Sequence, residues 1–175
     1  FRTFLRFAYS EGHISSPVIF QMPVISKKRL PVISPNDLKK VLAICTSKRD
    51  KAIVLLIVDT GLRRAEACAL NWGDLDIKSG LVRVRRGKGG KARSVVLGVA
   101  SRRKLLAYRR TVIHDDESPL IQTRSGKRLT HSGLRSVFMR LSETSGVSVT
   151  PHALRRTFAT LSLRAGMNPL HLQGL

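Results

Sequence analysis

The chain has 175 residues, which is enough for one domain with a substantial core and a short appendage. Its 32 Lys and Arg residues outnumber its 11 Asp and Glu residues, so the formal net charge is +21. A compact fold with this charge would repel itself unless a polyanion were bound, which favours a nucleic-acid partner. A ribosomal-type protein and a basic membrane-surface domain are the alternatives. The longest apolar run covers only residues 52–58, far fewer than the roughly 20 needed to cross a bilayer.

The two cysteines, Cys45 and Cys68, lie singly among apolar residues. Neither belongs to a Cys-x-x-Cys motif or lies near a pair of histidines, so the spacing does not favour a zinc site. The sequence therefore predicts two buried, reduced thiols and no metal. Reduced thiols fit a cytoplasmic protein, which a DNA partner would associate with the nucleoid.

The first 31 residues predict a helix followed by a linker. Apolar residues recur at helical spacing between Phe4 and Ala8, and Gly12 can end the helix in the left-handed conformation. Residues 14–31 contain three prolines and no helical period, which is typical of a linker. The basic residues of this linker could follow a phosphate backbone or simply be solvated.

Two serines begin the next predicted helices. Ser34 can cap the first one, Pro35 suits its first turn, and Asp37 favours the positive end of the helix dipole. Ser47 can cap the second, whose residues 52–58 are apolar on every side, so that this helix must be buried at the centre of the domain. A buried strand is the alternative, because a short apolar run does not reveal its period. The cap and the continuous length favour the helix.

The rest of the chain predicts a β-hairpin and further helices. Gly61 ends the central helix, and residues 63–70 restart it. Residues 81–85 alternate between apolar and basic positions, and a glycine-rich turn leads to a second β-rich run at 94–97, which indicates a hairpin. Another extended segment is expected near residues 120–127, and helices are expected at residues 100–112, 131–144 and 152–165 and from Pro169 onward. The predicted fold class is mixed α/β, predominantly α-helical, with a small antiparallel β-hairpin sheet.

Three motifs stand in a fixed order along the chain: Thr60-Gly61-Leu62-Arg63-Arg64-Ala65-Glu66, Gly87-Lys88-Gly89 and His152-Ala153-Leu154-Arg155. They resemble the Thr-Gly-Leu-Arg-x-x-Glu, Gly-Lys-Gly and His-x-Leu-Arg motifs of the tyrosine recombinase family, which includes phage integrases and Xer-type resolvases. The resemblance covers roughly residues 32–175, and residues 1–13 resemble the last helix of the family's separate core-binding domain. It implies a tyrosine recombinase catalytic domain at 32–175, joined by the linker at 14–31 to the end of a DNA-binding domain.

The resemblance also implies roles for individual residues. Arg63, Lys88, His152 and Arg155 would be catalytic, and Glu66 would support them. The activity would be site-specific recombination through a 3′-phosphotyrosyl intermediate, leading to integration, excision or resolution. The partner would be double-stranded DNA, bound by a homo-oligomer, a tetramer on paired sites, with no metal, cofactor or membrane involved.

The two motif arginines suit a phosphodiester clamp. A planar guanidinium can meet two non-bridging oxygens, and both Arg63 and Arg155 lie near the start of a predicted helix, where backbone N–H groups also face an anion. Alone, either arginine could be a solvated surface charge, and Arg63 could form an ordinary ion pair with Glu66. The surrounding motifs and their order favour the clamp.

Lys88 and His152 suit proton transfer. Lys88 lies between glycines at the hairpin tip, from which its ammonium could protonate a leaving 5′-oxygen. His152 could exchange the proton of a nucleophile near neutral pH, although a lone histidine is more often structural. Residues 87–92 also match a dinucleotide-binding G-x-G-x-x-A pattern, but a strand is predicted after them where that motif requires a helix.

Further basic residues are predicted to contact DNA phosphates, which gives affinity but little sequence specificity. These residues are Arg85, Arg86, Lys91, Arg93 and Arg128.

The nucleophile is expected outside this chain. The family pattern continues past residues 166–169 to a Gly-His pair and a tyrosine that would lie beyond Leu175, so the catalytic domain would be incomplete and inactive alone. Tyr9 and Tyr108 do not match that tyrosine, and we interpret them as packing or DNA-contact residues. A type IB topoisomerase and a non-catalytic DNA-binding module with the same fold are the alternative functions.

Overall fold

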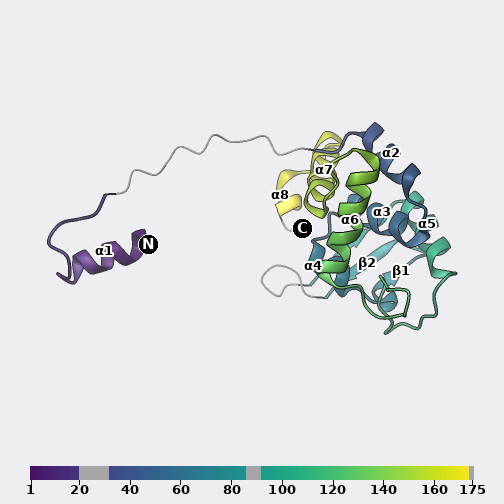
Figure 1. Cartoon of the computed structure of the whole chain (residues 1–175), viewed down its shortest axis with the longest axis horizontal. Coiled ribbons are helices and arrows are strands. Elements are labelled where there is room, and N and C mark those ends of the chain that lie inside the picture. Colours follow the sequence, from purple (N-terminus) through teal and green to yellow (C-terminus); the bar gives the residue numbers. More distant parts are fainter. Residues whose placement is uncertain (20–31, 86–91, 174–175) are drawn as a thin grey trace.

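The computed structural model describes residues 1–19, 32–85 and 92–173 (Figure 1). Helix α1 (Arg2–Ser10) forms where the apolar spacing predicts it, and Gly12 follows with a φ of 75°, in the left-handed region. Residues 20–31, which make up most of the predicted linker, lie outside the described residues.

Ser34 and Ser47 cap helices α2 (Pro35–Ile44) and α3 (Lys48–Thr60), as predicted. Each serine hydroxyl accepts a hydrogen bond from the backbone N–H three residues later, at 3.1 Å in α2 and 3.4 Å in α3. The capped N–H group belongs to an aspartate in both helices, which places a negative charge at the positive end of each helix dipole. Local sequence therefore determines where both helices begin.

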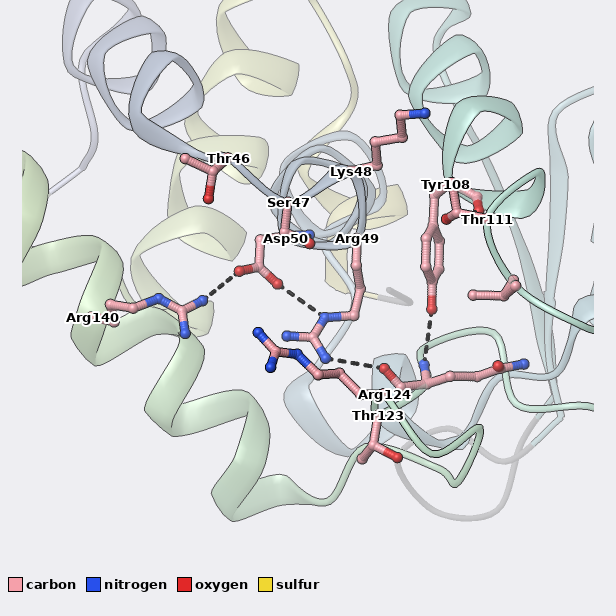
Figure 2. A pocket seen from close by; sticks show the side chains of 12 residues that line it. Thr46, Ser47, Lys48, Arg49, Asp50, Tyr108, Thr111, Thr123, Arg124 and Arg140 are labelled. Carbon is pink, nitrogen blue, oxygen red and sulfur yellow. Dashed lines mark hydrogen bonds and ion pairs between the residues drawn. The ribbon is translucent and has the colours of Figure 1, made fainter.

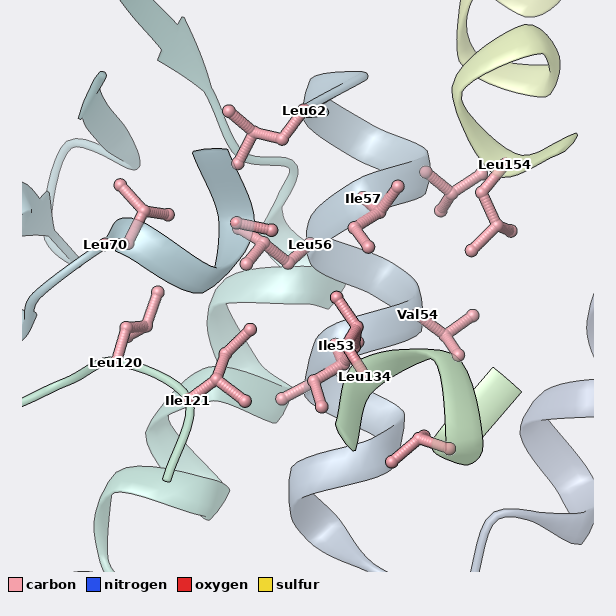
Figure 3. Packing of buried hydrophobic residues seen from close by; sticks show 14 of the residues in the cluster. Ile53, Val54, Leu56, Ile57, Leu62, Leu70, Leu120, Ile121, Leu134 and Leu154 are labelled. Atoms are coloured by element: carbon pink, nitrogen blue, oxygen red, sulfur yellow. The ribbon is translucent and has the colours of Figure 1, made fainter. Parts of the chain in front are cut away.

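Helix α3 is buried at the centre of the core, so the helix is correct and the strand alternative is wrong. Its most deeply buried apolar side chains are Ile53, Val54, Leu56 and Ile57. They point away from the helix axis in different directions, toward elements on several sides (Figure 3). The main neighbours of α3 are α5 (Val99–Arg109) and α7 (Pro151–Arg164). A helix that is apolar all round has to be covered in this way.

Gly61 ends α3 with a φ of 62°, and its N–H donates to the carbonyl of Ile57 at 2.9 Å. The chain then turns into the short helix α4 (Arg64–Ala69), which matches the predicted restart. A single 3-10 turn at Trp72–Asp74 leads from α4 to the sheet. The Gly61 turn therefore brings the end of α3 next to the start of α4, where the first motif lies.

A three-stranded antiparallel sheet contacts α3 through its strand β3. Strand β2 (Leu81–Val84) pairs with β3 (Arg93–Val96) in a register that sets Val82 opposite Val95, and both valines are buried. The predicted hairpin is confirmed. Strand β1 (Leu75–Asp76) pairs with the other edge of β2 and was not predicted, because two residues are too few to show an alternating pattern.

Helices α6 (His131–Ser145), α7 and α8 (Pro169–Gln173) lie where they were predicted. Helix α5 ends at Arg109, earlier than the predicted residue 112. The Thr111 hydroxyl donates to the carbonyl of Tyr108 at 2.6 Å, and such side-chain hydrogen bonds compete with the helical pattern. The chain is thus predominantly helical with one small antiparallel sheet, which confirms the predicted fold class.

Both thiols are free and buried, at 2% exposure for Cys45 and 4% for Cys68, as predicted. No helix in the described part of the chain is long and apolar enough to span a membrane. Within the same residues, no three His, Cys, Asp or Glu side chains lie close enough together to hold a metal ion.

Candidate active site

Arg155 reaches from α7 to the end of α3. Its Nη1 donates a hydrogen bond to the carbonyl of Gly61. Phe158, one turn further along α7, lies so close to Gly61 that a Cβ atom at this position would clash with the ring. The motif glycine therefore allows α7 to approach α3, and this approach determines where Arg155 lies.

Glu66, in the first turn of α4, accepts hydrogen bonds from two arginines. Arg63 donates from its backbone N–H to Oε2 and from Nη1 to Oε1, both at 2.8 Å. Arg93, the first residue of β3, donates from Nη1 to Oε1 at 2.9 Å and from Nη2 to Oε2 at 2.7 Å. One buried carboxylate therefore joins the first motif on α4 to the hairpin strand β3.

The charges of this region influence one another. Burial would raise the pKa of Glu66, but the hydrogen bonds from Arg93 and Arg63 lower it to about 2, so the carboxylate is ionised at neutral pH. Burial lowers the pKa of Arg155; the positive charges of Arg63 and Arg93 lower it further, while Glu66 raises it. Because Arg155 contacts Gly61, two residues before Arg63, the three arginines and Glu66 gather where α3, α4, β3 and α7 meet.

This arrangement is suited to binding a phosphate group. Two guanidinium groups hold one carboxylate, and the third, that of Arg155, contacts Gly61 close to Arg63, which leaves an excess of positive charge. The Arg63 side chain is 33% exposed and can meet a ligand from solvent, whereas Glu66 is only 5% exposed. Donors that are already held in place need little reorganisation when negative charge develops on a reacting phosphate.

His152 lies exposed in the first turn of α7, three residues before Arg155 and on the same helical face. It lines a cavity of about 430 Å³ together with Arg64 of α4 and with side chains of α6, among them Phe138 and Met139. The sequence did not predict this cavity, because its walls combine α4 with α6 and α7, which lie far from α4 in the chain.

Two predicted DNA contacts are engaged in the structure with other partners. The Arg85 side chain is 55% exposed and pairs with Asp74 at 2.6 Å. Arg128 donates from Nη1 to the carbonyls of Cys68 and Leu70, at 2.8 Å and 3.0 Å, and so satisfies carbonyl groups at the end of α4. Contacts of these two residues with DNA remain predictions.

Arg93, a third predicted DNA contact, is only 12% exposed, and both of its terminal nitrogens donate to Glu66. The sequence gave no sign of this pairing, which joins residues 27 positions apart. The remaining predicted site residues, Arg86, Lys88 and Lys91, lie outside the described residues.

Tyr108 lies beside the first turn of α3 (Figure 2), whereas Arg155 contacts Gly61 at the other end of that helix. Tyr108 lines a cavity of about 610 Å³, and its hydroxyl accepts a hydrogen bond from the N–H of Gln122 at 3.0 Å. A helix of this length separates its ends by about 20 Å. Burial also raises the pKa of Tyr108, so its hydroxyl is a poor nucleophile. The interpretation of Tyr108 as a packing residue is confirmed. Tyr9 is 47% exposed on α1, and its interpretation as a packing or DNA-contact residue stays a prediction.

The same cavity contains a charged cluster that the sequence analysis missed. Asp50, whose side chain is 4% exposed, pairs with Arg49 at 3.0 Å and with Arg140 of α6. Arg49 also donates to the carbonyl of Gln122 at 3.1 Å (Figure 2). These pairings fix the start of α3 to α6 and to the segment after α5, so this cluster stabilises the fold.

Comparisons with known proteins agree with the geometry. Residues 31–175 match the model of the phage integrase family. The tyrosine recombinase XerC of Thermodesulfovibrio yellowstonii is 35% identical over 99% of the chain, and the chain spans 63% of that relative's length. A crystal structure of XerA recombinase is similar, with a TM-score of 0.75 at 27% identity, over 94% of this chain and 60% of that one.

A structure of a lambda integrase dimer bound to a COC′ core site has the same fold. Its TM-score is 0.75 at 23% identity, over 98% of this chain and 67% of that one.

Proposed function

The chain belongs to the phage integrase family, and we propose on this basis that it carries the DNA-cleaving site of a site-specific recombinase. The proposed reaction breaks and rejoins DNA strands through a 3′-phosphotyrosyl intermediate. The observation that carries the proposal is that Arg63 and Arg93 are held by Glu66 and Arg155 by Gly61, because these contacts fix guanidinium donors in position, and the Arg63 side chain is 33% exposed to solvent.

We propose that Arg63 and Arg155 contact the non-bridging oxygens of the cleaved phosphate. A tyrosine hydroxyl attacks the phosphorus, a new O–P bond forms, and the bond to the 5′-oxygen breaks. His152 takes the proton of the hydroxyl, and Lys88 supplies a proton to the leaving oxygen. Rejoining reverses these steps, and because the phosphodiester energy is kept in the covalent intermediate, no nucleotide is consumed.

Tyr108 cannot supply this hydroxyl from the other end of α3, and Tyr9 belongs to the proposed preceding domain, so the attacking tyrosine is proposed to come from outside residues 1–175. Residues 1–13 are proposed to end a preceding DNA-binding domain, with 32–175 forming the catalytic domain. The proposed partner is double-stranded DNA, which the net charge of +21 supports, bound by a homo-oligomer on paired sites.

The covalent intermediate tests the function. The protein, as its gene encodes it, is incubated with nicked duplexes selected from a random-sequence pool by their binding to it. We expect a denaturant-resistant adduct with tyrosine on the 3′-phosphate and a free 5′-hydroxyl on the other product. Absence of an adduct on bound duplexes, or attachment to a 5′-phosphate, would contradict the proposal. Plasmid relaxation without recombination between two sites would favour a type IB topoisomerase.

A further inference from the structure

Arg93 and Glu66 form a two-pronged ion pair inside the proposed site. The two terminal nitrogens of Arg93 meet the two oxygens of Glu66 at 2.9 Å and 2.7 Å. The side chains are 12% and 5% exposed, so water competes little for either group. A pair with this parallel geometry fixes the plane of the carboxylate as well as its position.

The position of Arg63 depends on that carboxylate. Oε1 of Glu66 accepts from Nη1 of Arg63, and Oε2 accepts from the Arg63 backbone N–H, both at 2.8 Å. With the two bonds from Arg93, the carboxylate has four donors, about as many as its lone pairs can accept. Arg93 thus forms a bidentate pair with both oxygens of Glu66, whereas the side chain of Arg63 contacts only Oε1, through a single nitrogen.

We propose that Arg93 is a positioning residue, which acts through Glu66 to hold the guanidinium of Arg63 toward the phosphate. This inference rests on the proposed function. It assigns Arg93 a role different from the DNA contact that its sequence position suggested. Arg93 also neutralises part of the negative charge of Glu66, which Arg63 would otherwise neutralise alone.

Removing Arg93 should misdirect Arg63. Both oxygens of Glu66 would then be open to a new bidentate pair, and the neighbouring guanidinium of Arg63 can turn to form it. Its positive charge would be neutralised by Glu66 when it should act on the phosphate. If Glu66 were also made neutral, the attraction would vanish, and the presence of Arg93 should no longer matter.

A double-mutant cycle tests this dependence, with single-turnover cleavage of the nicked duplex measured at saturating protein. Arg93→Gln is expected to lower the cleavage rate by about tenfold or more in the otherwise native protein. In a Glu66→Gln background, the same substitution should change the rate by less than about twofold. An equal fractional loss in both backgrounds would overturn the proposal, because a residue needed for folding or for direct DNA contact would not depend on the charge of Glu66.

A matched control and a binding measurement complete the test. Arg83→Gln removes the same charge from the neighbouring strand β2, where Arg83 is exposed opposite Ser94, and should leave cleavage unchanged. An equal loss in this variant would mean that charge alone matters, which would contradict the proposal. The salt dependence of duplex binding should be unchanged in Arg93→Gln, whereas loss of a direct phosphate contact would reduce its slope by about 0.9.

Two further outcomes are distinguishable. If Arg93→Gln does not fold, Arg93→Lys replaces it in the same double-mutant cycle, because lysine keeps the charge but not the two-pronged geometry. Its effect on the cleavage rate should depend on Glu66 in the same way. If the native protein forms no adduct, the proposed function itself fails. Normal cleavage by a folded Arg93→Gln protein would overturn only the role of Arg93.

Discussion

At the scale of single residues, Glu66 links the stability of the site to pH. Its folded-state pKa of about 2 lies below its ordinary value of 4.5, so the ionised carboxylate stabilises the fold at any pH above that ordinary value. This stabilisation is lost as the pH falls from 4.5 toward 2 and Glu66 takes up a proton. The contribution of Glu66 to the free energy of unfolding should therefore change with pH only in the acidic range.

Urea unfolding of the native protein and of Glu66→Gln tests whether this stabilisation is lost at acidic pH. The difference between their free energies of unfolding should be constant from neutral pH down to about pH 5 and should shrink at lower pH. A difference that stayed constant down to about pH 2.5 would contradict the lowered pKa.

Lys88 is predicted to be the general acid. A substrate with sulfur in place of the 5′-bridging oxygen has a leaving group that needs no proton, so Lys88→Ala should regain most of its lost cleavage rate on this substrate. Single-turnover cleavage of the oxygen and sulfur substrates measures this rescue. Equal impairment on both would make Lys88 a positioning residue.

Short local motifs are enough to single out Arg63, Glu66 and Arg155, and the structure brings these residues to the junction of α3, α4 and α7; their roles in the reaction stay predictions. The partner of Arg93 was not predictable, because its contact with Glu66 joins a strand to a helix across 27 positions of the chain. A strand pattern indicates which residues alternate, but it does not identify the carboxylate that an arginine will meet.

At the scale of secondary-structure elements, two glycines end helices in the left-handed conformation but differ in their surroundings. Gly61 and Gly146 have φ values of 62° and 68°. A Cβ atom at Gly61 would clash with Phe158, whereas at Gly146 no atom lies within 4 Å. The two positions therefore share the backbone cost of a substitution, but only Gly61 adds a packing cost.

Alanine substitutions should separate these costs. Gly146→Ala should lower the free energy of unfolding by roughly 1–2 kcal/mol and leave cleavage unchanged. Gly61→Ala should destabilise the protein more and also lower cleavage, because the displacement of Phe158 moves Arg155 on the same helix. Thermal unfolding and single-turnover cleavage measure both effects. Equal stability losses, with normal cleavage by Gly61→Ala, would show that the close approach of α7 is unimportant.

Asp37 and Asp50 occupy equivalent positions, three residues after the capping serines of α2 and α3. Asp50 is buried and pairs with Arg49 and Arg140, whereas Asp37 pairs with the exposed Lys40. Asp50→Asn should therefore lower the free energy of unfolding by about 1–3 kcal/mol. Asp37→Asn should leave it almost unchanged, because exposed ion pairs contribute little. Denaturant unfolding compares the two, and equal losses would contradict a stabilising role for the Asp50 cluster.

These elements also show what local sequence can predict. The serine caps, the left-handed Gly12, the helix end at Gly61 and the all-round apolar α3 follow from neighbouring residues, and these features were predicted. Strand β1 and the ion pair between Asp50 and Arg140 of α6 depend on contacts between different segments, so no local pattern indicated them.

At the scale of the whole molecule, basic residues outnumber acidic ones, and three of the 11 acidic residues are buried. Asp50, Glu66 and Asp74 are buried, and each pairs with one or two arginines. The 32 basic residues outnumber the 11 acidic residues, so ion pairing within the fold cannot neutralise the chain, and the excess positive charge is available to an external polyanion. DNA binding by such a surface should weaken steeply as salt rises.

The proposed clamp predicts that cleavage and binding respond differently to the loss of an arginine. Arg63→Ala and Arg155→Ala should each lower single-turnover cleavage by about 10²-fold or more while weakening duplex binding only modestly, because the clamp acts mainly on charge that develops during the reaction. Arg164→Ala, which removes an exposed arginine from the last turn of α7, is the matched control and should cleave normally. Near-normal cleavage by either clamp variant, or a loss of cleavage no larger than the loss of binding, would contradict the assignment of these arginines to the reacting phosphate.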